Sequence, residues 1–163
     1  MIVNLKGLEK NAKAYEIRLS DQLFQNVLQA SGLRLNARAN DIIGVINLKL
    51  SGLRLNARVV LETKILLQCV RCLSEFLFDI NESYDFVYMP ANMAYEGAIS
   101  KNIELKEQDM NIGYYNEGSI DAYNIIIEAI NLSIPLNPVC LLRCEGLCQS
   151  CGANLNTEKC KCE

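Results

Sequence analysis

Residues 53–69 read LRLNARVVLETKILLQC, and this stretch decides the fold because apolar and polar residues alternate along it. Such a period of two is typical of a strand that buries one face. The apolar set consists of Leu53, Leu55, Ala57, Val59, Leu61, Ile65 and Leu67. We therefore expect a long, half-buried antiparallel strand, bent or bulged because of its length, that ends at Cys69.

A second alternating run follows at residues 75–89, EFLFDINESYDFVYM, with its aromatic side chains in phase. The two runs predict a β-hairpin with a short turn, VRCL, at its tip. Cys69 and Cys72 lie at this tip as a Cys-x-x-Cys motif, the arrangement of a zinc knuckle. Because a knuckle supplies only two of four ligands, we expect the tip to share a metal ion with other cysteines.

The other patterns predict an α+β protein, with an antiparallel, partly closed sheet and two helices packed against it. Residues 1–19 should be extended, and a helix should span about 20–30, begun by Ser20 and ended by Gly32. Residues 42–50 are rich in β-branched side chains and should form a further strand.

Residues 90–118 are polar and contain several glycines, which predicts a loop with one or two short strands, one of them at 102–106. A second helix should cover 119–134, begun by Ser119 and ended by the prolines that follow. Beyond these the chain is too poor in large apolar residues to build a core. We expect an α+β domain at 1–138 and a Cys-rich, zinc-binding tail at 139–163, docked on the 69–72 hairpin.

Cysteines dominate the chemistry of the chain, and the sequence contains no histidine. In a reducing compartment, closely spaced cysteines indicate metal binding rather than disulfides, and a set of four thiolates suits tetrahedral Zn²⁺. One or two ions would be structural, with no open position for catalysis. The candidate ligands are Cys69, Cys72, Cys140, Cys144, Cys148, Cys151, Cys160 and Cys162.

Two groupings of these thiols are compatible with the spacing. In the first, Cys69 and Cys72 share an ion with two tail cysteines, most naturally Cys148 and Cys151. In the second, the last four cysteines bind one ion together, and the hairpin pair joins Cys140 and Cys144 around another. The spacing alone does not choose between them.

Composition excludes several classes of function. The chain has 16 Lys and Arg against 19 Asp and Glu, a net charge of −3, which is not the basic balance of an extensive nucleic-acid binder. It has no apolar run of membrane-spanning length and no export signal, so we expect a cytoplasmic protein without a membrane partner. Without histidine or a phosphate-binding glycine loop, we expect no enzyme and no small-molecule substrate.

The octapeptide SGLRLNAR occurs at 31–38 and again at 51–58, which suggests a duplicated hairpin strand or a local duplication. Its arginines raise the hypothesis of an RNA-facing basic strip, although solvated strand faces are the plainer interpretation. The candidate contacts to nucleic acid are Arg34, Arg38, Arg54, Arg58, Lys64 and Arg71.

Several segments resemble the bacterial YceD family, the large ribosomal RNA subunit accumulation proteins. They are CVRCL at 69–73, IDAYNIIIEAINLSIPLNP at 120–138, CEGLCQSCGANLN at 144–156 and CKC at 160–162. The resemblance covers roughly residues 40–163. It implies a cytoplasmic, non-catalytic factor of ribosome biogenesis that supports the synthesis, processing or stability of large-subunit (23S) rRNA. Its partner would be that rRNA or its precursor, contacted directly or through ribosomal proteins.

Two other functions remain compatible with the residues. Cys69 and Cys72 could act as a thiol-disulfide oxidoreductase, with Arg71 lowering the pKa of a thiol. Alternatively, the chain could be a zinc-stabilised adaptor that binds only proteins.

Overall fold

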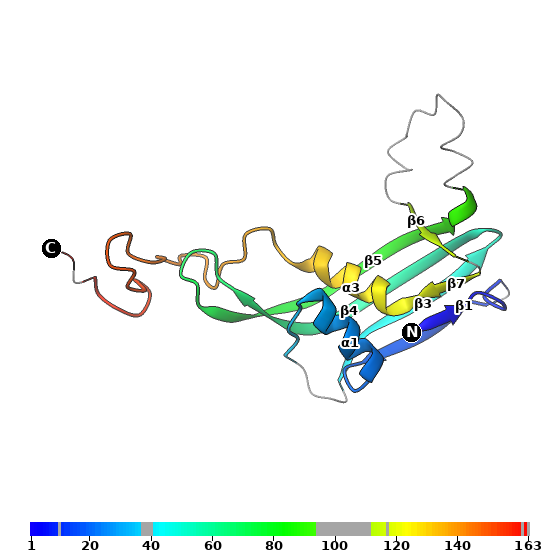
Figure 1. Ribbon diagram of the computed structural model, residues 1–163, viewed down its shortest axis with the longest axis horizontal. Coiled ribbons are helices and arrows are strands. Elements are labelled where there is room, and N and C mark those ends of the chain that lie inside the picture. The colour runs from blue at the N-terminus through cyan, green and yellow to red at the C-terminus, as the bar shows by residue number, and fades with distance from the viewer. Residues whose placement is uncertain (10, 37–40, 94–111, 117, 161, 163) are drawn as a thin grey trace, which may run out of the picture.

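The computed structural model describes residues 1–9, 11–36, 41–93, 112–116, 118–160 and 162. A five-stranded sheet has the order β2-β3-β4-β5-β6, and β1 and β7 pair in a separate two-stranded sheet (Figure 1). Neighbouring strands are antiparallel except β5 and β6. The strands are β1 (Ile2–Asn4), β2 (Lys13–Arg18), β3 (Ile42–Ser51), β4 (Arg54–Gln68), β5 (Glu75–Pro90), β6 (Ile112–Tyr115) and β7 (Ser119–Asp121).

The α+β class is therefore as predicted, with a mostly antiparallel sheet. Within the described residues the sheet is open, because its outer strands β2 and β6 each have a single neighbour, so the expected partial closure is not seen there. The expected strand at 102–106 lies outside the described residues. No helix in the described ranges has the length and hydropathy needed to cross a bilayer.

The β4–β5 hairpin is the longest element of the fold. Fourteen consecutive residue pairs join the two strands, from Leu55 opposite Tyr88 to Gln68 opposite Glu75. The register does not shift along them, so of the two expected irregularities, a bend or a bulge, the bulge is absent from this pairing. β3 pairs with β4 only as far as Leu61. The last part of the hairpin therefore extends beyond β3 and carries its tip away from the helices (Figure 1).

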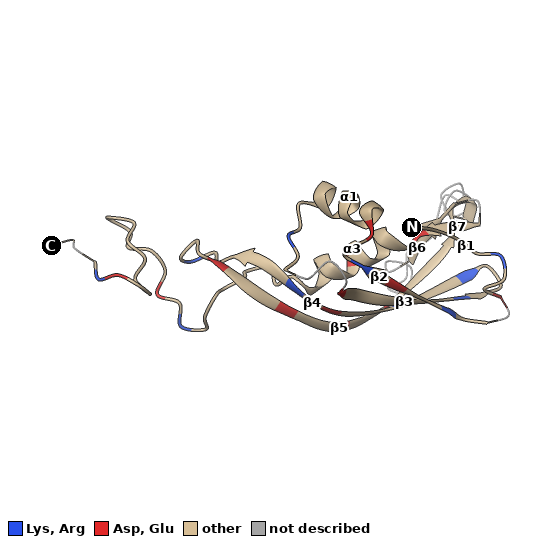
Figure 2. Cartoon of the chain, turned by 90° about the horizontal axis from the view of Figure 1, so that it is seen from below, with Lys and Arg blue, Asp and Glu red and all other residues tan. Residues whose placement is uncertain are grey.

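Helices α1 (Gln22–Ser31) and α3 (Ala122–Ser133) lie on one side of the sheet (Figure 2). Seven of the twelve α3 residues are buried, and their isoleucines meet the inward face of β4, where Leu55, Val59 and Leu61 are fully buried. Burial of apolar surface contributes about 25 cal/mol per Å², so this layer stabilises the fold. The alternation in 53–69 therefore identified the buried face correctly.

Both helix starts were predicted too early, by one residue at the first N-cap and by two at the second. Asp21 and Asp121, not Ser20 and Ser119, are the N-caps, and each side chain accepts a hydrogen bond from a backbone N–H of the first turn. Ser119 was misassigned because it belongs to β7, where it pairs with Asn4. Gly32 ends α1 as predicted, at φ 72° in the left-handed region.

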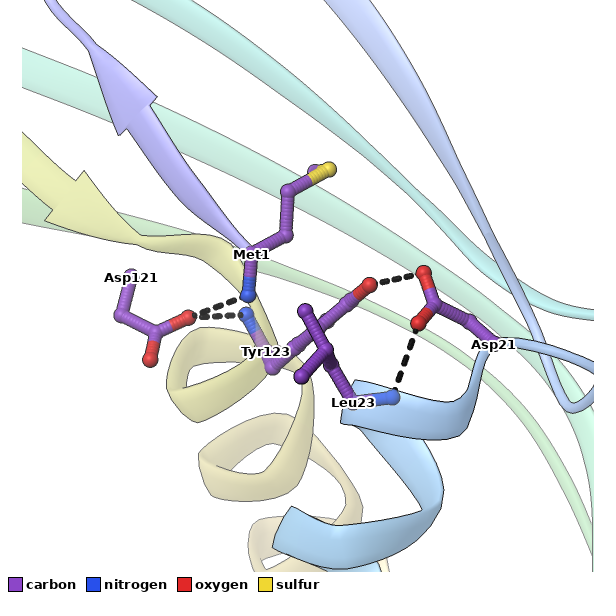
Figure 3. Close-up of polar contacts among 5 residues, drawn as sticks. All are labelled: Met1, Asp21, Leu23, Asp121 and Tyr123. Atoms are coloured by element: carbon purple, nitrogen blue, oxygen red, sulfur yellow. Dashed lines mark hydrogen bonds and ion pairs between the residues drawn. The ribbon is translucent and has the colours of Figure 1, made fainter.

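Polar contacts join the N-terminus, α1 and α3 (Figure 3). The Tyr123 hydroxyl of α3 donates to the Asp21 carboxylate, which also accepts from the Leu23 N–H at 3.0 Å. The Met1 ammonium lies 2.9 Å from the Asp121 carboxylate. The hydrogen bond from Tyr123 is the main reason why the pKa of Asp21 falls below 3.8, so this carboxylate stays ionised as a cap.

The two copies of SGLRLNAR adopt different structures, so the first copy is not a hairpin strand. At the second copy, Gly52 (φ 63°) turns the chain from β3 into β4. At the first, Gly32 ends α1, and Leu35 then forms a single antiparallel bridge with Ile65. Both glycines have positive φ, but different neighbours decide what the rest of each octapeptide does. Residues 34–36 of the first copy cover the edge of β4 that β3 leaves unpaired.

Candidate metal centres

Four thiols meet at the tip of the β4–β5 hairpin. Two come from the turn after β4 and two from the segment that follows α3, and their sulfur atoms all lie within 4.8 Å of one another. Most of this set is buried; the only half-buried member is Cys140. We call this set, Cys69, Cys72, Cys140 and Cys144, the hairpin centre.

Backbone hydrogen bonds fix the knuckle in the hairpin. The Cys69 N–H donates to Ser74 O at 2.9 Å, and the Leu73 N–H donates back to Cys69 O at 3.0 Å. Leu73 adopts a left-handed conformation, with φ 60°, that closes this turn. The Val70 N–H donates to Pro138 O at 2.9 Å, which brings the chain after α3 alongside the tip just before Cys140.

The sulfur separations fit a tetrahedral ion. A Zn–S bond of about 2.3 Å implies about 3.8 Å between two ligands of a regular tetrahedron. The Sγ atoms of Cys69 and Cys144 are 3.8 Å apart, and those of Cys72 and Cys140 are 3.6 Å apart. All eight cysteines are free thiols. The hairpin centre therefore has the donors and spacing of a closed metal site.

Neighbouring N–H groups favour negative charge on part of this set. Burial opposes ionisation of Cys69, yet backbone N–H groups, including that of Arg71 at 3.4 Å, lower its pKa to about 6. Hydrogen bonds from Ser74 lower the pKa of Cys72. Burial raises the pKa of Cys140 to about 12, so this thiol would have to lose its proton on binding a cation.

The remaining four cysteines form a second set, further along the tail. Their sulfur atoms also lie within 4.8 Å of one another, with Cys148 3.2 Å from Cys160 and 3.9 Å from Cys162. Cys148 is half-buried and the other three are exposed. We call this set, Cys148, Cys151, Cys160 and Cys162, the tail centre.

A second tight turn shapes the tail centre. The Cys148 N–H donates to Ala153 O at 2.8 Å, and the Gly152 N–H donates to Cys148 O at 2.9 Å. Gly152 has φ 73°, a conformation that side chains disfavour. The N–H of Cys151 is the main cause that lowers the pKa of Cys148 to about 6. In both turns, backbone N–H groups lower the pKa of the first cysteine of a Cys-x-x-Cys pair, but the tail turn is more exposed than the hairpin turn.

Asparagines link the two centres. The Asn156 amide donates to the Cys144 sulfur at 3.4 Å, and its carbonyl oxygen accepts from the Glu145 N–H at 2.9 Å. The Asn154 amide reaches Ser74 Oγ, on the hairpin, at 3.1 Å. The sequence analysis did not include either asparagine among the candidate site residues. The only feature that pointed to them was the GANLN segment that follows Cys151.

The structure therefore has the second of the two predicted groupings. Cys69 and Cys72 face Cys140 and Cys144, not Cys148 and Cys151. The reason is local: the bond from Val70 to Pro138 places Cys140 beside the hairpin tip before the chain reaches the later cysteines.

Two of the six basic candidates for nucleic-acid contact are already paired with acids of β5. Arg34 forms an ion pair with Glu75, and Lys64 lies 2.7 Å from Asp79. Both pairs are exposed, so each contributes little to stability. They do offset the positive charge that a phosphate backbone would meet.

Three of the other four candidates do not gather in one place. Arg54 begins β4 and Arg71 lies beyond its end, so β4 separates them by roughly 50 Å at about 3.3 Å per residue. Arg58 lies opposite Asp85 in the register of β4 and β5. The Arg71 guanidinium donates to Cys144 O at 3.2 Å, where it supports the hairpin centre. Arg38 lies outside the described residues.

Fold and thiol geometry together define an α+β protein with two candidate four-cysteine metal sites. A family model described as "Large ribosomal RNA subunit accumulation protein YceD" matches residues 57–163, which is most of the chain. The chain belongs to the YceD family.

Individual relatives match over shorter stretches. An uncharacterized protein of Mycobacterium leprae is 31% identical over 91 residues, covering 56% of this chain and 38% of that protein. A Zea mays protein named large ribosomal RNA subunit accumulation protein YCED homolog 1, chloroplastic, is 49% identical over 45 residues, 27% of this chain and 15% of its own length. The Arabidopsis thaliana protein of the same name is 42% identical over 43 residues, 26% of this chain and 13% of its own length.

The chain thus spans about two fifths or less of the length of these relatives. No solved structure matches the chain.

Proposed function

We propose that this protein is a non-catalytic factor of bacterial ribosome biogenesis that supports the synthesis, processing or stability of large-subunit (23S) rRNA. Membership of the YceD family supports this proposal, as do the names of the plant relatives. The partner would be large-subunit rRNA or its precursor, met in the cytoplasm. The ion pairs at Arg34 and Lys64 favour association through a ribosomal protein over a continuous basic strip.

Each centre would hold one structural Zn²⁺. The observation that carries this proposal is the grouping of eight thiols into two sets of four, at separations close to the edges of a zinc–thiolate tetrahedron. Thiolates are soft ligands that select zinc over hard cations such as Mg²⁺. With four protein ligands no position is open, so the ion contributes folding energy, on the order of 10 kcal/mol, rather than chemistry.

On this proposal, residues 1–138 form the α+β domain and residues 139–163 a tail that metal docks on the 69–72 hairpin. The tail is short of apolar residues, and Leu142 is 95% exposed within it. Its apolar packing is confined to a small cluster in which Val139 and Leu147 lie against the buried thiols of the hairpin centre. Its order therefore depends mainly on metal cross-links. The rigid tail and hairpin tip would together present the surface that the partner recognises.

A redox function is less well supported. Cys69 has a lowered pKa, as a reactive thiol needs, but its side chain is fully buried and faces Cys144. A substrate disulfide would have to reach it through the other thiols of the hairpin centre. A low-pKa thiol without access is better suited to hold a cation.

Depletion of the protein in its host tests the proposed function. The ratio of 23S to 16S rRNA should fall, and it should recover with the wild-type gene but not with a Cys69→Ser, Cys144→Ser variant. Sedimentation with large-subunit precursors, with and without ribonuclease, would separate direct rRNA contact from contact through proteins. An unchanged rRNA ratio after full depletion would contradict the proposal.

A further inference from the structure

Charge is strongly segregated among the described residues. Between Glu75 and Leu142 the described residues include six acids and not one lysine or arginine. This part contains β5, β6, β7 and α3, while the cations of β2, β3 and β4 lie earlier in the chain (Figure 2). Two of the acids, Glu75 and Asp79, are paired with Arg34 and Lys64, and Asp85 lies opposite Arg58. Glu82 on β5 and Glu128 on α3 are the acids of this part that face the helices' side of the sheet.

A cavity of about 390 Å³ lies on the same side, between α3 and the strands β5 and β6. An aromatic row from β5 lines it: Tyr84, Phe86 and Tyr88 have neighbouring ring centroids 6.1 and 6.3 Å apart. From α3 the cavity is lined by Glu128 and by Leu132, a side chain that is 59% exposed. We call it the aromatic groove.

Two tyrosines that line the aromatic groove form hydrogen bonds with residues of α3. Tyr88 Oη donates to the Glu128 carboxylate at 3.2 Å, and Tyr84 Oη lies 3.0 Å from Ser133 Oγ. Both tyrosine side chains therefore connect β5 to α3 through hydrogen bonds. Apart from these tyrosines, the ionisable residues that line the cavity are Glu128 and Asp85. The Asp85 side chain lies on the other face of β5, opposite Arg58, so Glu128 supplies the negative charge of the groove.

Among the described residues, β5 has an unpaired backbone edge beside the groove. β6 pairs with β5 only from Val87 to Pro90. From Glu75 to Phe86, no strand of the described residues pairs with β5 on the edge opposite β4. Such an edge presents backbone N–H and C=O groups that an added strand can bind. Glu82 projects from this stretch on the same face as Tyr84, two residues away.

We propose that the aromatic groove and the free edge of β5 bind an extended, arginine- or lysine-rich segment of a partner protein. The backbone of that segment would add a strand to the Glu75–Phe86 edge. Its cationic side chains would meet Glu82 and Glu128, and would lie over the rings of Tyr84 and Phe86, where cations are attracted to aromatic faces. The site is separate from both cysteine sets, so it stands whether or not the metal proposal holds.

The acidic charge of this face disfavours two other occupants, a nucleic acid and a second copy of the chain. A nucleic acid would bring phosphates against Glu82 and Glu128, which costs rather than gains free energy. A second copy would have to present this same acidic edge in a symmetric strand pairing, and like charges would then oppose one another. A cationic segment is the occupant whose charge complements this face.

Fluorescence anisotropy tests the proposal on the full chain. The probe is a fluorescein-labelled twelve-residue peptide that alternates arginine and valine. The test variant is Glu82→Lys and the matched control is Glu62→Lys. Glu62 and Glu82 lie at adjacent registers of one hairpin, opposite Asn81 and Leu61, but on its two different faces. Both change the net charge equally.

We expect Glu82→Lys to weaken binding by about tenfold, and Glu62→Lys to change it much less, because only the former reverses charge beside the groove. Raising the salt concentration should weaken binding, since the contacts are exposed ion pairs. A peptide whose alternate backbone nitrogens are methylated should bind poorly, because it cannot add to a strand edge. Circular dichroism and thermal unfolding of both variants establish that they are folded.

Three results would overturn the proposal. Equal weakening by the two substitutions would mean that the peptide senses only net charge. Equal binding of the methylated peptide would show that the peptide does not add a strand to the edge of β5. Competition by a single-stranded RNA of twelve nucleotides, or a chain dimer that Glu82→Lys dissociates, would assign the groove to nucleic acid or to a second copy.

Discussion

The sulfur atoms of Cys69 and Cys144 lie 3.8 Å apart although 75 residues separate them in sequence. Cys69 is placed by the end of β4, and Cys144 by the segment that begins where α3 stops. The β4–β5 hairpin and the chain after α3 thus converge at one point, beyond the part of the sheet that the helices cover. An ion at that point would join the longest element of the fold to a tail that has no core of its own.

Removing one ligand from each set should separate the roles of the two centres. Cys144→Ser should cost one zinc ion and expose residues 139–163 to limited proteolysis, because it breaks the link to the hairpin. Cys151→Ser should also cost one ion but leave the chain before Cys148 protected. Zinc analysis and mass spectrometry of the fragments measure both. Identical cleavage patterns in the two variants would refute the division into two centres.

The two centres should lose metal at different rates. The thiols of the tail centre are mostly exposed, whereas Cys69 and its partners are mostly buried, so a chelator reaches the tail ion first. Zinc release to a colorimetric chelator should therefore show a fast and a slow phase of equal amplitude. Cys151→Ser should abolish the fast phase only. A single phase in the wild-type chain would contradict this expectation.

The contact between Asp21 and Tyr123 should contribute to stability. Asp21→Ala removes a helix cap worth about 1 kcal/mol. It also leaves the Tyr123 hydroxyl without its acceptor, at a further cost of about 1–3 kcal/mol if no water replaces it. Tyr123→Phe keeps the cap and should cost less. Urea unfolding at neutral pH compares the two, and a larger loss for Tyr123→Phe would disprove the assignment of the cap.

The same contact predicts a dependence on pH. The folded-state pKa of Asp21 is lowered, so its charge stabilises the fold above its ordinary value of 3.8, and this contribution is lost as the pH falls through the lowered pKa. The stability difference between wild type and Asp21→Asn should therefore be complete at neutral pH and shrink on acidification. A difference that stays constant down to pH 2 would argue against an ionised cap.

Gly113 allows the Tyr88 ring to lie over β6. A Cβ at this position would come within 2.4 Å of the ring, so Gly113→Ala should destabilise the fold by about 1–3 kcal/mol. In a Tyr88→Ala background the same substitution should cost much less, because the ring is gone. Thermal unfolding of the wild type, the two single variants and the double variant gives the coupling energy between the two positions. Equal costs in the two backgrounds would rule out the ring as the cause.

Period-two patterning made the hairpin predictable. Alternation in 53–69 and 75–89 is a property of the residues themselves, and it gave the two long strands and their buried faces. The helix caps were less predictable, because Ser119 is a good cap in isolation and only its pairing with Asn4 in β7 displaces the helix start. The two copies of SGLRLNAR make the same point, since one sequence is a helix end in one place and a hairpin in the other.

The site was predictable in composition but not in grouping. The absence of histidine and the spacing of the cysteines indicated thiolate sites, yet the choice of partners for Cys69 depends on the contact between Val70 and Pro138. Similarly, Arg34 and Lys64 looked available for RNA in the sequence, and only the register of β4 with β5 and the path of residues 34–36 bring them to Glu75 and Asp79. Long-range pairing of this kind leaves no signal in local spacing.

Metal content of the purified chain tests the central claim most directly. Protein prepared without chelator should contain two zinc ions per chain, with all eight thiols reacting slowly until EDTA is added. A chain that carries no zinc, and whose thiols react at once whether or not EDTA is present, would contradict the account.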